Sequence, residues 1–441
     1  MKPVQVGIIG LGTVGCGVAR LLTESGNRFH QRLGAPLILR KVADLDLERP
    51  RPVQLDPRLL TSQVRDILDD PEIDIVVELI GGVDAARELV MAAIARGKHV
   101  VTANKHLLAL HGNEIFQAAA QAGVEVAFEG SVGGGIPMIL SLRQGLAANR
   151  IKEMFGILNG TANYILTRMS TEAASFQQAL QEAQDQGYAE ADPTLDVEGI
   201  DTAHKLAILM ALAYGAPIDF TAIAVEGISE LELVDLQFAR EFGYQIKLLA
   251  ITRDDGQRVE ARVHPTMIPV DHILANVNGP YNAVYIIGDA VGPILLYGQG
   301  AGMMSTASAV VADLIELARN LTHGIKRRMP PLGIENFSQR RRVIKPLDDL
   351  VTNYYFRFAA QDRPGVLSQV SGILGKNQIS IAAVIQKGRG LQESVPIVMI
   401  THEAREADVN QALAEIDQLP EISQKTVLLR IEDPGLDSAQ I

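Results

Sequence analysis

The stretch VQVGIIGLGTVG, residues 4–15, decides the fold of the first part of the chain. An apolar run typical of a buried strand leads into the spacing Gly-x-Gly-x-x-Gly and then into a helical pattern. The first glycine permits a tight turn, the second admits a pyrophosphate, and the third lets helix and strand pack closely. The stretch predicts dinucleotide binding at a helix N-terminus, although glycines that only shape a turn are the simpler alternative. The residues expected to face the cofactor are Gly10, Gly12, Thr13, Val14 and Gly15.

The pattern around this turn predicts a parallel sheet. Short β-rich runs alternate with helical segments, and the runs are apolar throughout, as strands buried on both faces are. Residues 1–130 are therefore expected to form an α/β dinucleotide-binding domain of the Rossmann type. The expected strands are Val4–Ile9, Leu37–Ala43, Ile73–Ile80, His99–Thr102 and Val124–Phe128, with helices at Ala85–Arg96 and Ile115–Ala122.

Asp44 follows the second predicted strand, where a Rossmann fold places the adenosine ribose. A carboxylate there accepts hydrogen bonds from the ribose hydroxyls and repels the 2′-phosphate of NADPH. We therefore expect NADH to be used efficiently and NADPH less well, with Arg40, Lys41 and Arg49 close enough in sequence to oppose this effect. The alternative is that Asp44 only starts the turn.

Two further domains are predicted after residue 130. Residues 131–303 mix longer helices with strands such as Val259–Val263 and Ala283–Ile287, which is typical of an α+β substrate and dimerisation domain. The helix at 304–322 is expected to return to the first domain. Residues 323–350 contain three prolines and seven Lys or Arg residues, which favours an exposed linker.

Residues 351–432 show the order β, α, β, β, α, β of a ferredoxin-like domain, and residues 433–441 form a tail. The predicted elements are Tyr354–Ala360, Val366–Lys376, Ile379–Gln386, Val395–Thr401, Glu406–Asp417 and Lys425–Ile431.

Composition excludes several classes of protein. A net charge of −12 and a pI near 5.3 repel a nucleic-acid backbone, so no nucleic-acid partner is expected. Cys16 is the single cysteine, which excludes an intrachain disulfide and suits the cytoplasm. We expect neither a signal peptide nor a membrane segment, because no apolar stretch reaches the roughly 18 residues of a membrane span.

Carboxylates gather before an unusually apolar helix. The run GYAEADP at 187–193 continues through Asp196 to Asp201 and Lys205, and residues 206–213 are all apolar. Asp201 and Lys205 are four residues apart and share one helix face. Because this helix has no polar face to hold an ordinary surface pair, the pair indicates a buried or cleft-lining site.

Three other segments carry candidate functional residues. Thr102-Ala103-Asn104-Lys105 ends a predicted strand, where open parallel sheets bind ligands, so Lys105 is expected to face cofactor or substrate rather than solvent. Residues 129–137, EGSVGGGIP, permit close backbone approach or offer carbonyls to a cation, unless they are only a hinge. Residues 298–302, GQGAG, lead into a helix and form either a second ligand loop or only an N-cap.

In this order the motifs resemble those of one family, the homoserine dehydrogenases with a C-terminal ACT domain. The resemblance runs from Val4 to about Ile431, and its most specific parts are NGTAN at 159–163, residues 191–199 with Asp201 and Lys205, and Gly300-Ala301-Gly302. It implies an NAD- or NADP-dependent oxidoreductase that interconverts L-aspartate 4-semialdehyde and L-homoserine. It also implies a homodimer or homotetramer formed through the substrate and ACT domains.

The resemblance assigns roles to individual residues. Lys205 would be the catalytic proton donor, with Lys105 as a second catalytic lysine. The substrate contacts would be Gly160, Thr161, Gly187, Tyr188, Glu190, Asp196 and Asp201. Cofactor contacts beyond the glycine turn and Asp44 would be Gly81, Thr102, Lys105 and Gly302. A structural, sodium-like cation would be bound, largely through backbone carbonyls, by Glu129, Val132, Gly134 and Ile136.

The last domain resembles ACT modules through the stretch DRPGVL at 362–367. Such modules commonly pair and bind an amino acid at their interface, which implies feedback control by L-threonine. Effector contacts are expected at Gly365, Val366 and Asn377. Removal of residues after about 345 is then expected to leave an active, threonine-insensitive enzyme.

The chain departs from the family pattern at two places. Met303-Met304-Ser305 stands where the family usually has a proline after Gly302, and an acidic stretch, Ala43-Asp44-Leu45-Asp46, follows the second strand instead of a basic residue. Two other functions remain as alternatives. A dehydrogenase of another amino-acid derivative would be distinguished by a substrate assay, whereas a non-catalytic amino-acid sensor would leave Glu190, Asp201 and both lysines without a role.

Overall fold

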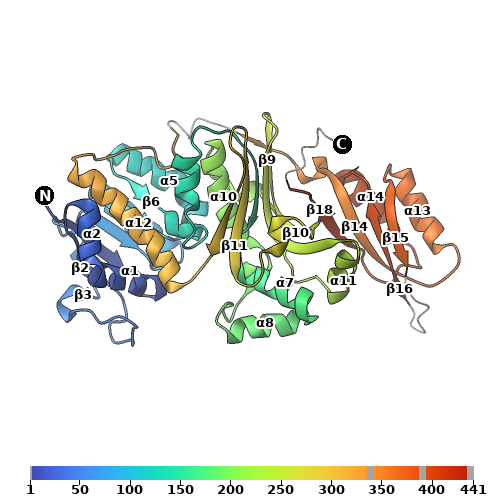
Figure 1. Ribbon diagram of the computed structural model, residues 1–441, viewed down its shortest axis with the longest axis horizontal. Coiled ribbons are helices and arrows are strands. Elements are labelled where there is room, and N and C mark those ends of the chain that lie inside the picture. Colours follow the sequence, from blue (N-terminus) through green and yellow to red (C-terminus); the bar gives the residue numbers. More distant parts are fainter. Residues whose placement is uncertain (1, 335–341, 387–393, 435–441) are drawn as a thin grey trace. The chain divides into compact units, whose positions relative to one another are not determined.

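The computed structural model describes residues 2–334, 342–386 and 394–434 (Figure 1). The chain divides into two compact units. The first is built from residues 1–160, 201–223 and 280–342, and the second from residues 161–200, 224–279 and 343–441. Residues 131–303, which the sequence predicts to form one domain, are therefore divided between the two units.

The first unit holds a six-stranded sheet in the order β3-β2-β1-β4-β5-β6, in which every neighbouring pair is parallel. The predicted Rossmann-type sheet is thus confirmed. The strand order reverses between β1 and β4, which is where such sheets bind dinucleotides, and Gly10 follows β1 at this point. The strands are β1 (Val4–Ile9), β2 (Leu37–Ala43), β3 (Leu60–Thr61), β4 (Ile75–Glu78), β5 (His99–Thr102) and β6 (Val126–Ala127).

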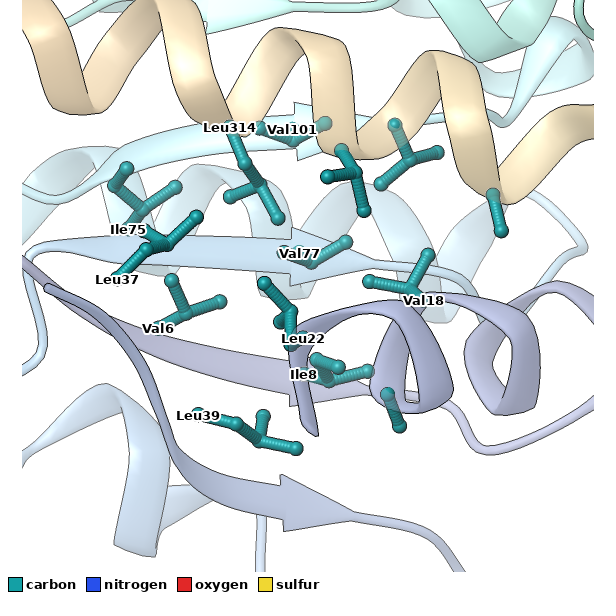
Figure 2. Packing of buried hydrophobic residues seen from close by; sticks show 14 of the residues in the cluster. Val6, Ile8, Val18, Leu22, Leu37, Leu39, Ile75, Val77, Val101 and Leu314 are labelled. Atoms are coloured by element: carbon teal, nitrogen blue, oxygen red, sulfur yellow. The ribbon is translucent and has the colours of Figure 1, made fainter. Parts of the chain in front are cut away.

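Branched aliphatic side chains form the core between this sheet and the helices α1 (Thr13–Glu24) and α12 (Met303–Thr322) (Figure 2). Leu314 of α12 is fully buried in it, so a helix from far along the chain completes the dinucleotide-binding core. Gly17 permits the close packing of the two helices, because a Cβ there would lie 2.8 Å from the Cβ of Ala307. The other helices packed around the sheet are α2 (Gly26–Leu33), α3 (Arg65–Leu68), α4 (Asp84–Ala95) and α5 (Lys105–Ala122).

Three further strands of the same unit pair antiparallel in the order β12-β11-β7. Its strands are β7 (Ile151–Ile157), β11 (Tyr281–Gly288) and β12 (Gly292–Gln299). Helix α10 (Ile200–Tyr214) is the apolar helix singled out in the sequence, and 13 of its 15 residues are buried. The prediction that this helix is buried on nearly every side is confirmed.

The second unit contains the predicted ferredoxin-like order. Its elements are β14 (Val351–Ala360), α13 (Val366–Lys376), β15 (Ile381–Gln386), β16 (Val395–Thr401), α14 (Glu406–Ile416) and β18 (Val427–Ile431). Alternate aromatic residues of β14, Tyr354, Phe356 and Phe358, pack with Val370 of α13 and Val409 of α14. The period of two along β14 thus gives this sheet one face for its core.

The ferredoxin-like sheet continues beyond β18. Strand β18 runs parallel to β10 (Arg258–Pro269), with Arg430 opposite Thr266, and β10 is antiparallel to β9 (Tyr244–Asp254). The described helices and strands that complete the chain are α6 (Met138–Leu140), α7 (Gly160–Glu172), α8 (Phe176–Asp185), α9 (Thr194–Val197), β8 (Ala224–Val225), α11 (Leu233–Glu241), β13 (Val343–Ile344) and β17 (Ala404–Arg405).

The expectation of an exposed linker at 323–350 is partly wrong. Leu332 is 1% exposed, and β13 pairs with β10 in the second unit. Apolar residues within the basic, proline-containing segment therefore find buried or paired positions, and residues 335–341 of it lie outside the described part. Among the described residues, no helix is long and apolar enough to cross a membrane.

Candidate active site

Three ionisable side chains meet at the start of α10. Lys205 Nζ lies 2.6 Å from Asp201 Oδ2, and Lys105 Nζ, at the first residue of α5, lies 2.6 Å from Asp201 Oδ1. Asp201 and Lys205 are buried, whereas the Lys105 side chain is 42% exposed. The fold thus brings both predicted lysines to one carboxylate, and we call this group the lysine–aspartate cluster.

The charge of Asp201 is fixed by its surroundings. Burial by itself would raise the pKa of this carboxyl, but the ammonium groups of Lys205 and Lys105 hold it well below its usual range. Asp201 is therefore ionised at neutral pH, and its negative charge favours the charged form of both lysines.

A carbonyl and two asparagines extend the cluster, and the sequence had assigned none of them a role. The Leu158 carbonyl accepts hydrogen bonds from Lys205 Nζ at 2.7 Å and from Asn282 Nδ2 at 2.8 Å. Asn159 Nδ2 donates to Asp201 Oδ2 at 2.9 Å. Asn159 lies in the NGTAN motif, whereas Asn282 directly precedes the predicted strand Ala283–Ile287 and no motif marks it.

Two histidines, the neighbours of Lys105 and Lys205 in the chain, stack on each other. The ring centroids of His106 and His204 are 4.6 Å apart, and His204 also packs against Phe220 at 4.5 Å. Burial, with His106 adding to it, lowers the pKa of His204 to about 4. His204 is therefore neutral at pH 7 and joins α5 to α10 through ring packing rather than charge.

The glycine turn has the backbone that a bound dinucleotide needs. Gly10 has a φ of +103°, and a Cβ there would lie 2.5 Å from the Leu79 carbonyl oxygen. A Cβ on Gly15 would lie 2.1 Å from the Gly10 carbonyl oxygen, whereas nothing lies within 4 Å of one on Gly12. The turn is thus packed on its inner side and open where a pyrophosphate would approach the N-terminus of α1.

Asp44 is already engaged by the protein. Its Oδ2 accepts a hydrogen bond from the Leu11 amide at 2.6 Å, and its Oδ1 lies 3.2 Å from Arg51 Nη2. Beside it is a cavity of about 350 Å³ lined in part by Leu11, Arg49 and Arg51. The negative charge that was expected to reject a 2′-phosphate therefore has an arginine partner.

Three other predicted cofactor residues differ in their placement. Thr102 is fully buried, and its hydroxyl donates to Glu78 Oε2 at 2.7 Å, so its side chain does not face a ligand. Burial raises the pKa of Glu78. Gly81 follows β4 with a φ of +74° and is exposed, and Gly302 is the N-cap of α12 with a φ of +123°.

The predicted cation loop surrounds a buried carboxyl. Glu129 accepts hydrogen bonds from the amides of Ile139 and Leu140, both at 2.8 Å, and its own amide donates to Asp313 at 2.8 Å. Burial, and then mutual repulsion, raises the pKa of Asp313 well above its usual range. Within the described residues, no three His, Cys, Asp or Glu side chains are grouped as a metal site, so a cation here would depend on backbone carbonyls.

Most of the predicted substrate residues belong to the second unit. Thr161 Oγ1 donates to the Tyr188 carbonyl at 2.7 Å, which fixes the turn that begins at Gly187, where φ is +74°. Glu190 follows in an exposed position, and Asp196 is half-buried in α9. Gly160 belongs to the first unit, where a Cβ would lie 2.8 Å from the Pro280 carbonyl oxygen.

The three predicted effector residues do not form one group within a single chain. Gly365, with a φ of +98°, caps the start of α13, and Val366 packs into the core of the ferredoxin-like domain. Asn377 caps the other end of this 11-residue helix, about 18 Å away at about 1.5 Å per residue.

A dinucleotide turn and a buried lysine–aspartate cluster within one compact unit are typical of a nicotinamide-dependent oxidoreductase. Three family models match the chain: a homoserine dehydrogenase NAD-binding domain at residues 10–129, a homoserine dehydrogenase model at 137–315, and an ACT domain at 354–421. The chain belongs to the homoserine dehydrogenase family. It is an NAD(P)-dependent oxidoreductase that acts on a CH–OH group and interconverts L-aspartate 4-semialdehyde and L-homoserine.

Relatives support this assignment over nearly the whole length. A homoserine dehydrogenase of Pseudomonas aeruginosa is 47% identical over 434 residues, which cover 98% of this chain and 99% of the relative. The crystal structure of a homoserine dehydrogenase from Thiobacillus denitrificans is 49% identical with a TM-score of 0.92, covering 98% and 99% of the two chains. A hyperthermophilic archaeal homoserine dehydrogenase, solved in complex with NADPH, is 27% identical with a TM-score of 0.60 and covers 74% of this chain and 100% of its own.

Proposed function

We propose that Lys205 donates a proton to the aldehyde oxygen of L-aspartate 4-semialdehyde. The observation that carries this proposal is the buried Asp201 carboxylate, which contacts Lys205 and Lys105 at 2.6 Å each. Ionised Asp201 keeps Lys205 protonated and oriented. Lys105, which is more exposed, faces the bound cofactor and substrate.

When bound, the reduced nicotinamide supplies a hydride to the aldehyde carbon. As that C–H bond forms, the C=O electron pair moves to oxygen, and the proton of Lys205 completes the hydroxyl of L-homoserine. In the reverse direction neutral Lys205 accepts the hydroxyl proton, so homoserine oxidation is favoured at alkaline pH. Gly160, Thr161, Gly187, Tyr188, Glu190 and Asp196 are proposed as the remaining substrate contacts, with the two carboxylates facing the substrate ammonium.

For the cofactor, we propose that NADH and NADPH are both used, with a small preference for NADH. Asp44 favours the ribose hydroxyls, as its place in the sequence predicts. The pairing of Arg51 with Asp44 reduces the repulsion that a 2′-phosphate meets, and Arg49 in the same cavity wall offers it a cation. The NADPH complex of the archaeal relative agrees with access for the phosphorylated cofactor.

A monovalent cation is proposed to bind Glu129 and the carbonyls of Val132, Gly134 and Ile136. Gly133 and Gly134 have φ values of +73° and +57°, which turn the backbone sharply within this loop. A cation there would offset the buried charge of the Glu129 carboxylate.

The ACT domain is proposed to bind L-threonine between two copies of the chain. Because Gly365 and Asn377 lie at opposite ends of α13, one chain alone does not close a site around so small a ligand, whereas a second copy can bring one end beside the other. Strand β15 is the last strand of its sheet path and exposes Val384, which gives a second copy a place to pair. The assembly is accordingly a homodimer or homotetramer.

One assay tests these proposals together. Oxidation of NADH and of NADPH is measured with aspartate semialdehyde, with and without threonine, at one pH and ionic strength. We expect turnover with both cofactors, kcat/KM values within about tenfold of each other in favour of NADH, and inhibition by threonine. A preference for NADPH of more than about tenfold in kcat/KM contradicts the role given to Asp44. If the enzyme turns over only a different semialdehyde, the assignment of the substrate is wrong.

A further inference from the structure

Asn282 and the proposed proton donor depend on the same carbonyl. Lys205 Nζ and Asn282 Nδ2 both donate to Leu158 O, at 2.7 and 2.8 Å. Leu158 directly follows β7, and Asn282 lies on the neighbouring strand β11, whose next residue, Ala283, pairs with Ile157. The position of the Leu158 carbonyl, and with it that of the Lys205 ammonium, is therefore set in part by Asn282.

Asn282 also contacts the loop that leads to α12. A Cβ on Gly300 would lie 2.0 Å from Asn282 Nδ2 and 2.1 Å from its Cγ, so the carboxamide packs directly on the Gly300 backbone. Gly134 also lies close to Gly300, because a Cβ on Gly134 would lie 2.7 Å from the Gly300 carbonyl. The loop with Gly300 and Gly302, which resembles a cofactor-contact loop, thus rests on the side chain that also fixes Leu158.

Burial of the Asn282 carboxamide costs free energy. Asn282 is 1% exposed, and its Oδ1 has no hydrogen-bond partner among the described residues. A buried amide with one unsatisfied acceptor destabilises the fold relative to an apolar side chain of similar shape. A residue that served packing alone would not need the Nδ2 donor.

We propose that Asn282 is a positioning residue that aligns the proton donor with the nicotinamide loop. It does so by donating to Leu158 O on one side and supporting Gly300 on the other. This inference rests on the proposed role of Lys205. The hydride donor and the proton donor must both reach the aldehyde group of the substrate. Asn282 contacts the carbonyl that holds Lys205 and also the loop proposed to contact the cofactor.

The main test compares Asn282→Asp and Asn282→Ala in the full chain. Aspartate has nearly the same shape but cannot donate to Leu158 O when ionised, and its charge favours protonated Lys205. We expect kcat to fall about tenfold to a hundredfold in both variants. For Asn282→Asp, the alkaline rise of homoserine oxidation should also move up by about one pH unit.

A mutational cycle tests the contact with Gly300. Gly300→Ala should displace the Asn282 side chain and lower kcat in the same way. In the Asn282→Ala background, where the space is open, Gly300→Ala should lower kcat much less. Equal costs in both backgrounds would overturn the proposed link. The cycle also keeps the inference testable if Asn282→Asp folds poorly.

Asn113→Ala is the matched control, because Asn113 Nδ2 likewise donates to a backbone carbonyl, that of Ile218, at 2.8 Å. It should leave the pH profile unchanged. Lys205→Ala separates the two proposals. Full activity of Lys205→Ala would refute the proposed proton donor, whereas an inactive Lys205→Ala together with wild-type kcat and pH profile in both Asn282 variants would refute only the role of Asn282.

Discussion

The molecule contains two kinds of buried charge cluster, one built on lysines and one on arginines. In the first unit, Lys105 and Lys205 share the carboxylate of Asp201. In the second unit, Arg357 donates to both oxygens of Asp235 at 2.6 and 3.0 Å, which joins β14 of the ACT domain to α11.

A second arginine of the ACT domain forms a similar cluster within the second unit. Arg430 of β18 contacts Glu226 through two nitrogens, each at 2.8 Å, and also donates to the buried Glu406. Glu226 is followed by Gly227 and Ile228, and the amide of Ile228 donates to Val197 O at 2.7 Å, just before α10 begins. These arginine contacts therefore reach the part of the second unit that directly precedes α10 in the chain.

The difference between the clusters separates chemistry from architecture. A lysine releases and accepts a proton within the range in which enzymes work, whereas an arginine stays charged and holds a carboxylate through a planar fork of donors. Burial alone would lower the pKa of Arg430, but Glu226 and Glu406 raise it. The lysine cluster is thus suited to proton transfer, and the arginine clusters are suited to fixing the ACT domain in place.

The largest expected effect is on Lys205. Lys205→Ala should lower turnover by about 10²–10⁴-fold, the usual scale of general acid catalysis. Lys205→Arg should lower turnover nearly as much, because arginine can keep the contact with Asp201 but does not release its proton. Steady-state kinetics on folded protein measures both, and near-normal turnover of either variant contradicts the distinction between the two kinds of cluster.

The next effect is on the stability of the ACT junction. Arg357→Met leaves the fully buried Asp235 without its main partner and should cost about 3–5 kcal/mol in urea unfolding. Arg20→Met, which breaks an exposed pair with Glu24, should change stability by less than about 1 kcal/mol. If Arg357→Met is as stable as Arg20→Met, the buried Arg357–Asp235 pair does not stabilise the ACT domain.

The smallest expected effect is a pH dependence at His204. Its pKa in the folded chain is about 4, against an ordinary value of 6.5, so the unfolded chain takes up a proton first as the pH falls. Stability is therefore lost between about pH 6.5 and pH 4. From pH 7 to pH 5 this amounts to about 2 kcal/mol, at about 1.4 kcal/mol per pKa unit.

His204→Gln should flatten that part of the stability profile, measured as urea midpoints at the two pH values. The groups near His204 that also titrate or carry charge are His106, Asp201, Lys105 and Lys205. His30, which is exposed on α2, is the control position. An unchanged slope in His204→Gln would mean that the histidine stack does not exclude the proton.

The truncation after residue 345 stays a prediction, and the structure shows which contacts it would remove. A truncation after residue 345 was expected to leave an active enzyme, but β18 pairs with β10, and Glu432 accepts hydrogen bonds from Arg262 and Arg253 at 2.6 and 2.7 Å. Removal of the ACT domain would expose β10 and leave the buried Arg262 without this partner. Point variants such as Arg357→Met are therefore the better test of regulation.

The sequence by itself determined the local elements and the class of site. Apolar runs and the glycine spacing gave β1, β2 and β5 with the bounds that the structure has, because strand period and turn geometry are local properties. The apolar stretch after Asp201 and Lys205 likewise predicted that this pair is buried, because a helix without a polar face cannot expose the pair to solvent.

Only the tertiary structure decided which distant residues share a site. Lys105 meets Asp201 because α5 packs near α10, and Asn282 joins Lys205 because β11 pairs with β7; neither contact has a period or spacing in the sequence. The ion pair of Arg51 with Asp44 and the continuation of the ACT sheet into β10 were equally hidden. Such contacts depend on the packing of whole elements, where the burial of apolar faces outweighs any local preference.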